Sequence, residues 1–188
     1  MEETASDERR QKVIEALGQA RAMELRAIAQ YMNHHYNLDN MDYGDMAAKV
    51  KLIAIDEMRH AEMFAERIEE LGGQPGTDQS DRPERDGDPA KIFTANTALE
   101  DGAISAYNSF LLICRDNGDS ESARLFQDII ADEQIHFNYF DNVRKHIEQL
   151  GQTYLAQVAG TSSATGIVYQ GFVDRQEAQY VPGGGGGA

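Results

Sequence analysis

The sequence predicts an all-α protein: a four-helix bundle with one long crossover and a short fifth helix near the C-terminus. Three observations lead to this fold. Four long stretches of good helix formers carry apolar residues at helical spacing. Short polar breaks separate the first stretch from the second and the third from the fourth, and a long segment rich in proline and glycine separates the two pairs.

The first pair of helices is expected over residues 7–37 and 50–71. The first stretch lacks proline, and its apolar residues recur every three or four positions. A short polar break at 38–41 follows it, and the second stretch ends at two glycines, a common helix terminator. The short break makes this pair an antiparallel hairpin.

The second pair follows the proline-rich segment 72–88. Its first helix is expected over 89–117, with Pro89 in the first turn. Its second helix is expected over 119–150, followed by a short fifth helix over 152–159. Because helices of about 30 residues are about 45 Å long, segment 72–88 must travel the length of the bundle.

We expect a single domain over residues 1–160. The hydrophobic content of 41% in 188 residues is ample for a core. Residues 161–188 carry no apolar periodicity and include five consecutive glycines. This tail is therefore expected to be disordered.

The composition excludes several classes of function. A net charge of -15 repels a phosphate backbone, so nucleic acid is not an expected partner, whereas cations are attracted. No run approaches the roughly 18 apolar residues that a membrane-spanning helix needs. Cys114 is the single cysteine, and the first ten residues do not resemble a secretory signal, so a cytoplasmic location is expected.

The two predicted hairpins repeat each other at an offset of 76 residues. In the first helix of each pair, Glu24 corresponds to Glu100 and Tyr31 to Tyr107. The second helices share an Asp-Glu-x-x-His motif, in which the matching residues are Asp56 and Asp132, Glu57 and Glu133, and His60 and His136. Two hairpins with one polar pattern predict a pseudo-twofold bundle with two equivalent half-sites.

The glutamates and histidines of this repeat interrupt apolar helix stripes. Each buried carboxylate costs several kcal/mol unless it is paired or bound to a metal. A single Glu-x-x-His is usually a solvated pair, and an inward salt-bridge network is the stronger alternative. That network lacks cations, because the inward stripes hold no Lys or Arg at the same level. Two divalent metals would balance the charge, and oxygen donors with one imidazole each favour iron or manganese.

The sequence resembles the bacterioferritins over residues 12–160. The resemblance rests on Ala-x-Glu-Leu-x-Ala-Ile-x-Gln-Tyr around Glu24, on Ala-Ile-Asp-Glu-Met-Arg-His-Ala-Glu over 54–62, and on Asp-Glu-Gln-x-His over 132–136. A Glu from each of two helices, with Glu-x-x-His from each of the other two, is the ligand set of ferritin-like di-iron and di-manganese bundles. The resemblance therefore implies a di-iron centre.

The resemblance also implies a role for each residue. One iron would be bound by Glu24 and His60, the other by Glu100 and His136, and both would be bridged by Glu57 and Glu133. Tyr31 would hydrogen-bond a ligand or transfer electrons, with core packing as the alternative. Met58 would point outward and, with a second subunit's methionine, ligate a haem at a twofold interface. Asp56 and Asp132 would support the ligands or guide iron, or lie on a solvated face.

Members of this family form hollow shells of 24 subunits, built from dimers. They oxidise Fe(II) with O2 or H2O2 and store the ferric mineral, which also detoxifies the iron. A small ferredoxin-type protein would reduce the stored mineral through the haem. Two alternatives stay open: a small di-iron oxidase or peroxidase that removes oxidants without storing mineral, and a structural bundle dimer with incidental metal binding.

Overall fold

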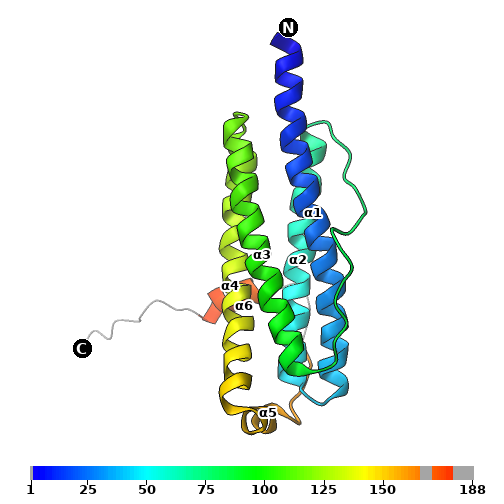
Figure 1. Ribbon diagram of the computed structural model, residues 1–188, viewed down its shortest axis with the longest axis vertical. Coiled ribbons are helices and arrows are strands. Elements are labelled where there is room, and N and C mark those ends of the chain that lie inside the picture. Colours follow the sequence, from blue (N-terminus) through cyan, green and yellow to red (C-terminus); the bar gives the residue numbers. More distant parts are fainter. Residues whose placement is uncertain (1, 166–170, 180–188) are drawn as a thin grey trace, which may run out of the picture.

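The computed structural model describes residues 2–165 and 171–179. Four long helices form an elongated bundle of two antiparallel hairpins (Figure 1). The helices are α1 (Glu2–Asn40), α2 (Gly44–Glu70), α3 (Pro89–Asp116) and α4 (Ser120–Leu150). The described residues contain no β-strand, and a single isolated bridge joins Tyr43 to Thr161. The predicted all-α bundle with one crossover is confirmed.

Capping residues set the ends of the second hairpin. Asp88 accepts a hydrogen bond from the backbone N–H of Ala90 at 2.8 Å, and Pro89 occupies the first turn, where no N–H is needed. Asp119 caps α4 in the same way, because its side chain accepts a hydrogen bond from the backbone N–H of Ser122 at 2.9 Å. Gly118 has a φ of 79°, a left-handed conformation that glycine adopts readily. The chain can therefore leave α3 and enter α4 within a few residues.

Helix α1 is longer at both ends than the apolar pattern indicates. It begins at Glu2 rather than near residue 7, and it continues through the expected break to Asn40. Residues 6–12 are all exposed, so this part of the helix needs polar helix formers rather than an apolar face. Its first turns extend beyond the end of the second hairpin (Figure 1).

The crossover between α2 and α3 has no helix or strand, as predicted, and it runs back along α1 (Figure 1). The backbone N–H of Glu84 donates to the side-chain oxygen of Gln30 at 3.0 Å. The side-chain amide of Asn37 donates to the carbonyl of Asp86 at 2.9 Å. These bonds attach the segment to α1 while the chain returns to the other end of the bundle.

The core consists of two apolar clusters along the bundle axis. Phe93 and Phe140 belong to one cluster, Phe64 and Phe126 to the other, and all four side chains are fully buried. The candidate metal ligands lie between the two clusters in every one of the four helices. Hydrophobic burial on both sides thus stabilises the bundle around a polar layer.

The C-terminal region corrects one expectation. The short helix α5 (Gln152–Val158) is present as predicted. Residues 172–179 fall in the segment expected to be disordered but form α6 (Phe172–Gln179), which packs on α2 and α4 (Figure 1). An eight-residue helix is too short to give a clear apolar period, so the pattern could not reveal it. Residues 166–170 and 180–188 of the expected tail lie outside the described part.

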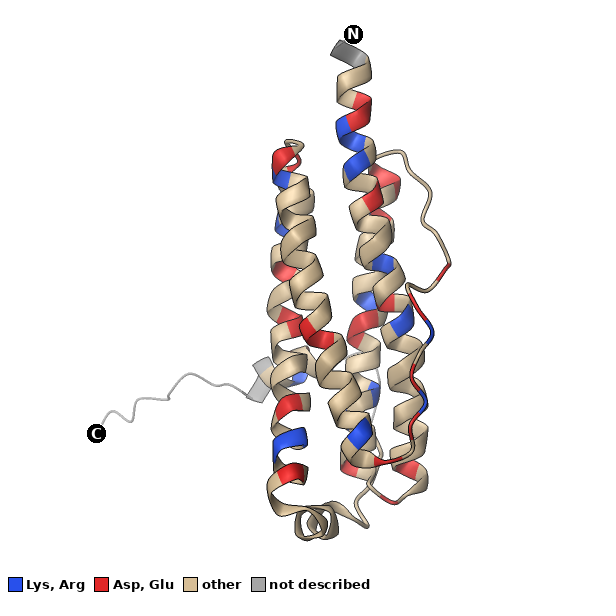
Figure 2. Cartoon of the chain, viewed as in Figure 1, with Lys and Arg blue, Asp and Glu red and all other residues tan. Residues whose placement is uncertain are grey.

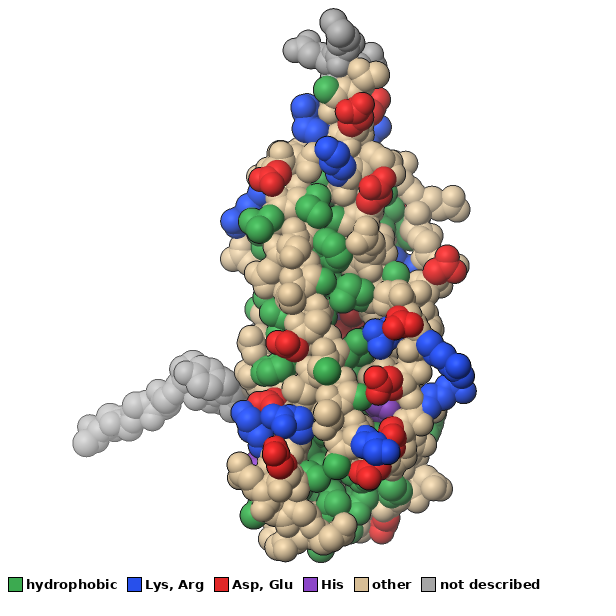
Figure 3. All heavy atoms as spheres, in the orientation of Figure 1, with side chains coloured by type: hydrophobic (Ala, Val, Ile, Leu, Met, Phe, Trp, Pro, Cys, Tyr) green, Lys and Arg blue, Asp and Glu red, His purple; other side chains and the backbone are tan. Residues whose placement is uncertain are grey.

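Charged side chains of both signs cover the surface. Figure 2 marks the positions of charged residues along the helices of both hairpins and the crossover. Figure 3 shows them interspersed with hydrophobic side chains on one face of the molecule. None of the helices described here is both long and apolar enough to cross a membrane.

Candidate metal centre

The six residues that the sequence predicts as metal ligands meet at one level of the bundle. Helices α1 and α3 each supply one glutamate, and α2 and α4 each supply a Glu-x-x-His pair. Residues three apart lie on the same side of a helix, so each pair points inward together. All six residues are at most 2% exposed: Glu24, Glu57, His60, Glu100, Glu133 and His136.

These side chains form two overlapping groups. The groups are Glu24, Glu57, His60 and Glu133, and Glu57, Glu100, Glu133 and His136. Within each group the ligand atoms lie within 4.8 Å of one another. Glu57 and Glu133 belong to both groups. The arrangement can therefore hold two metal ions with two carboxylates shared between them.

Each histidine presents its Nδ1 atom to three carboxylates. His60 Nδ1 lies 3.0 Å from Glu57 Oε2, 3.1 Å from Glu133 Oε1 and 3.8 Å from Glu24 Oε1. His136 Nδ1 lies 3.2 Å from Glu57 Oε1, 3.3 Å from Glu133 Oε2 and 4.0 Å from Glu100 Oε1. One ring N–H cannot satisfy three carboxylates. A cation between them could contact all of them.

The other ring nitrogen of each histidine faces an aspartate. His60 Nε2 lies 3.3 Å from Asp132 Oδ2, and His136 Nε2 lies 3.4 Å from Asp56 Oδ2. A carboxylate at Nε2 fixes the ring orientation and favours the proton there, which leaves Nδ1 free to bind a metal. Both aspartates therefore contact the candidate ligands, and neither lies on a fully solvated face.

Two buried tyrosines hydrogen-bond to the site across the bundle. Tyr31 donates to Glu100 Oε1 at 2.6 Å, and Tyr107 donates to Glu24 Oε1 at 2.5 Å. The expected hydrogen bond of Tyr31 to a candidate ligand is present, although its acceptor lies on the opposite hairpin. The motifs predict no separate role for Tyr107, and its match to Tyr31 in the repeat is the signal that could have indicated one.

Without a cation, the layer cannot keep all its carboxylates charged. Burial, together with the neighbouring Glu133 and Glu57, raises the pKa of Glu24 well above its ordinary value, and the same causes raise the pKa of Glu100. Burial disfavours the charged form of both histidines, but the surrounding carboxylates outweigh it and raise the pKa of each ring. Protons therefore occupy the metal-free site, and a metal ion would displace them.

Two buried carboxylate oxygens form no hydrogen bond among the described residues, Oε1 of Glu57 and Oε1 of Glu133, although each lies 3.1–3.2 Å from a histidine Nδ1. They belong to the two residues that both groups share. A buried carboxylate oxygen without a hydrogen bond is costly, and a metal ion on each side would satisfy it. Oxygen donors with one imidazole per ion suit iron or manganese. The residues present thus fit a di-iron centre.

Met58 points away from this layer. It follows Glu57 by one residue, which turns the side chain by about 100° around the helix. The residue is 57% exposed, so the predicted outward orientation is confirmed.

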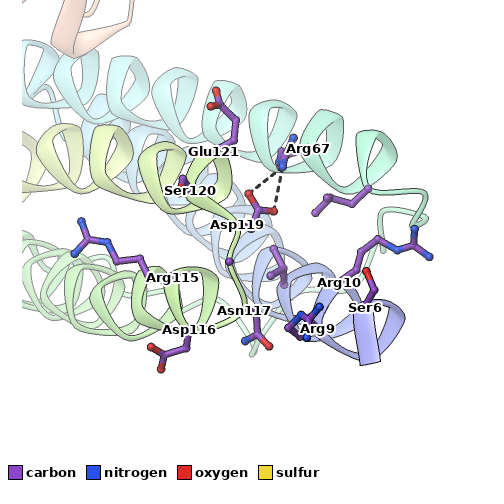
Figure 4. Close-up of a pocket in the computed structure, with 13 residues that line it drawn as sticks. Ser6, Arg9, Arg10, Arg67, Arg115, Asp116, Asn117, Asp119, Ser120 and Glu121 are labelled. Atoms are coloured by element: carbon purple, nitrogen blue, oxygen red, sulfur yellow. Dashed lines mark hydrogen bonds and ion pairs between the residues drawn. The ribbon is translucent and has the colours of Figure 1, made fainter. Parts of the chain in front are cut away.

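A separate cavity of about 930 Å³ lies at the N-terminal end of α1, beside the turn between α3 and α4 (Figure 4). Arg9, Arg10 and Arg115 line it, together with Arg67, which forms two hydrogen bonds of 3.0 Å with the carboxylate of Asp119. None of the six candidate ligands lines this cavity. It is therefore distinct from the metal centre.

Comparisons with known proteins show the family of the chain. Residues 14–150 match the family model of the ferritin-like domain. A bacterioferritin of Desulfovibrio desulfuricans is 54% identical over 167 residues, which cover 89% of this chain and 93% of the relative. Bacterioferritin BfrA of Mycobacterium tuberculosis is 32% identical over 146 residues, which cover 77% of this chain and 92% of the relative.

Solved structures show the same similarity. The X-ray structure of the D. desulfuricans bacterioferritin, described with its diiron site in different catalytic states, gives a TM-score of 0.85 at 53% identity and covers 89% of this chain and 98% of its own. The crystal structure of BfrA from M. tuberculosis gives 0.76 at 31% identity, with coverages of 81% and 97%. The resemblance inferred from three short motifs thus extends over nearly the whole bundle, and the chain belongs to the bacterioferritins.

Proposed function

We propose that this chain is the subunit of an iron-storage ferroxidase, which oxidises Fe(II) at a di-iron site within each subunit and deposits ferric mineral in a hollow shell. One observation carries the proposal: buried Glu57 and Glu133 take part in both groups of candidate ligands. This supports two ions held side by side by shared carboxylates. The bacterioferritin relatives support iron as the metal.

Two ferrous ions held together can give up two electrons in one event. Two Fe(II), one O2 and two protons yield two Fe(III) and one H2O2. With H2O2 as the oxidant, two Fe(II) and two protons yield two Fe(III) and two water molecules. Paired electron transfer avoids the release of a one-electron radical. The residues of the chain hold the two ferrous substrate ions close together, and carboxylates can change their binding mode as the charge on iron rises.

Met58 is our candidate for haem binding. Methionines from two subunits would ligate one haem, and the exposed thioether on the outer side of α2 supports this role. A haem with two thioether ligands supplies electron transfer when it is bound. A small ferredoxin-type protein would provide the electrons that reduce the stored mineral.

The assembly is proposed to be a shell of 24 subunits built from dimers. Several large apolar side chains are exposed on the single chain and would be covered by subunit contacts: Tyr36, Met58, Met63, Leu112 and Leu150. With subunits of 20.9 kDa, such a shell has a mass of about 500 kDa.

Particle mass, iron content and oxidation rate test this function together. Anaerobic protein loaded with two Fe(II) per subunit is mixed with O2 or H2O2 in a stopped-flow instrument, and the product is then sized. We expect rapid oxidation and a large particle that accumulates iron. A dimer that consumes oxidant without accumulating iron would instead support the small oxidase or peroxidase, and slow oxidation at the rate of free iron would contradict both.

A further inference from the structure

The pseudo-twofold symmetry of the metal centre is broken beside α2 and α4. The side chain of Asp132 is 37% exposed, whereas that of its counterpart Asp56 is 4% exposed. Helix α6 accounts for the difference, because its first residues bind Asp56, and no described helix binds Asp132 in this way. Figure 1 shows α6 beside the middle of α4.

Asp56 joins α6 to a candidate ligand. Its Oδ2 accepts hydrogen bonds from the backbone N–H groups of Phe172 at 2.6 Å and Val173 at 3.1 Å. The same oxygen lies 3.4 Å from His136 Nε2. A helix N-terminus favours a carboxylate as its cap. The cap of α6 is therefore also the partner that orients the imidazole of His136.

Side-chain contacts fix α6 in this place. The ring of Phe172 is buried, with its centroid 6.4 Å from that of His136 and 5.1 Å from that of Tyr139. Arg59 on α2 forms an ion pair with Asp174 on α6 at 2.7 Å. The His136 ring thus has an aspartate, a phenylalanine and a short helix between it and the solvent.

Gly171 makes the close approach possible. A Cβ atom at this position would overlap the carboxylate of Asp56. With any side chain there, either the Asp56 carboxylate or the start of α6 must move, and the contact between them is lost. The contact between α6 and α2 therefore requires glycine at position 171.

We propose that residues 171–173 and Asp56 form a strap that closes the His136 half-site and positions His136. A metal ion bound by His136 then exchanges more slowly than one bound by His60, whose partner Asp132 is open to solvent. This inference rests on the proposed di-iron function. Changes to the partner of a metal-binding histidine alter metal affinity by about 10- to 100-fold, so we expect a difference of this order between the two release rates.

Release of Co(II) tests the strap without any turnover. The full-length protein is loaded anaerobically with Co(II), and an excess of chelator is added while the cobalt absorption is followed. We expect two ions per subunit, released in two phases whose rates differ by about tenfold or more. Gly171→Ala should accelerate the slow phase by about tenfold. Gly18→Ala is the control, because its added Cβ meets nothing within 4 Å, and it should change neither phase.

Two further variants assign the phases. Asp132→Ala should accelerate the fast phase alone. Phe172→Ala keeps the backbone donors to Asp56 but removes the ring from His136, and it should accelerate the slow phase less than Gly171→Ala. Thermal melting of each metal-free variant checks that the fold is retained, which a change in release rate alone cannot show.

The outcomes separate the strap from the proposed function. Two Co(II) ions that leave at a single rate, or a slow phase that neither Gly171→Ala nor Phe172→Ala accelerates, would overturn the strap and leave the di-iron site in place. Binding of fewer than two Co(II) ions per subunit would count against the di-iron site itself, and the strap would fail with it.

Discussion

The two halves of the metal centre have the same ligands in different surroundings. The histidine contacts of the two halves match closely: 3.3 Å from His60 to Asp132, and 3.4 Å from His136 to Asp56. The surroundings differ because α6 covers only Asp56. A repeat in sequence thus preserves the candidate ligands and their histidine contacts, while a segment outside the repeat can make the halves unequal.

Aromatic side chains beside the site pack against residues of the other hairpin. Tyr31 packs against Phe140 with ring centroids 5.2 Å apart, and the matching pair Tyr107 and Phe64 lies at 5.7 Å. In each pair, the two residues come from different hairpins. Neither hairpin alone contains a complete half-site, so both hairpins must dock before any metal is bound with the full set of ligands.

The largest effect is expected where the halves share a residue. Glu57→Ala or Glu133→Ala should abolish rapid Fe(II) oxidation, because each removes a carboxylate that both metal positions use. Stopped-flow measurement at two Fe(II) per subunit checks this, and Glu62→Ala on the exposed side of α2 is the control.

Both variants should still fold. Neither side chain belongs to the two apolar clusters, and each has a buried oxygen that forms no hydrogen bond in the metal-free protein. Thermal melts are therefore expected to show little loss of stability. If the fast phase persists in both variants, the bridging assignment is wrong.

The stability of the metal-free protein should depend on pH more strongly than that of the metal-loaded protein. In the metal-free fold, the pKa values of Glu24, Glu100 and both histidines lie above their ordinary 4.5 and 6.5. The folded state then binds more protons than the unfolded state, so the free energy of unfolding falls as the pH rises above about 5. The lowered pKa of Glu133 acts in the opposite sense, at pH values below its ordinary 4.5.

Melting temperatures at about pH 6 and about pH 8 measure this effect. We expect the metal-free protein to melt at a lower temperature at the higher pH. The loaded protein should lose much less, because bound ions rather than protons balance the carboxylates. An equal pH dependence of both forms would show that the site does not hold the extra protons.

The oxidation rates of two tyrosine variants allow a direct comparison of the two half-sites. Tyr31→Phe and Tyr107→Phe each remove one hydrogen bond, to Glu100 and Glu24 respectively. Such a loss costs about 1 kcal/mol, so each variant should slow oxidation by less than about tenfold. Equal rates would indicate hydrogen bonding as the shared role. A clearly slower Tyr31 variant would instead indicate that this tyrosine also transfers electrons.

The smallest effect on oxidation is expected from Met58→Leu. The residue is 57% exposed and leucine conserves volume, so stability should change by less than about 1.5 kcal/mol. Haem should be lost while both half-sites keep their oxidation rate, and reductive release of stored iron should slow. An optical spectrum that still shows a haem with two methionine ligands would refute the assignment.

The bundle and the buried cluster of glutamates and histidines could be predicted because both depend on periodic patterns. Helical spacing placed Glu57 and His60 on one face, and the offset of 76 residues identified Glu133 and His136 as their counterparts. Because no Lys or Arg lies on the inward stripes at this level, metal ions are the cations expected to balance the buried carboxylates. These conclusions need only helix geometry and charge balance.

The partners across the bundle could not be predicted in the same way. The crossed hydrogen bond of Tyr31 depends on how two hairpins dock, and no local spacing encodes that. The position of α6 depends on Gly171 fitting against Asp56, a contact between residues more than 100 positions apart. The N-terminal extension of α1 was missed because an exposed helix needs no apolar period.

The bond between Asp56 and α6 also sets an order of events during synthesis. Phe172 and Val173 follow Asp56 by 116 and 117 residues, and they also follow every candidate ligand in the chain. Because a protein is made from its N-terminus, both hairpins leave the ribosome before the strap does. The strap is thus the last part of the proposed His136 half-site to leave the ribosome, and the half-site can be closed only after both hairpins have emerged.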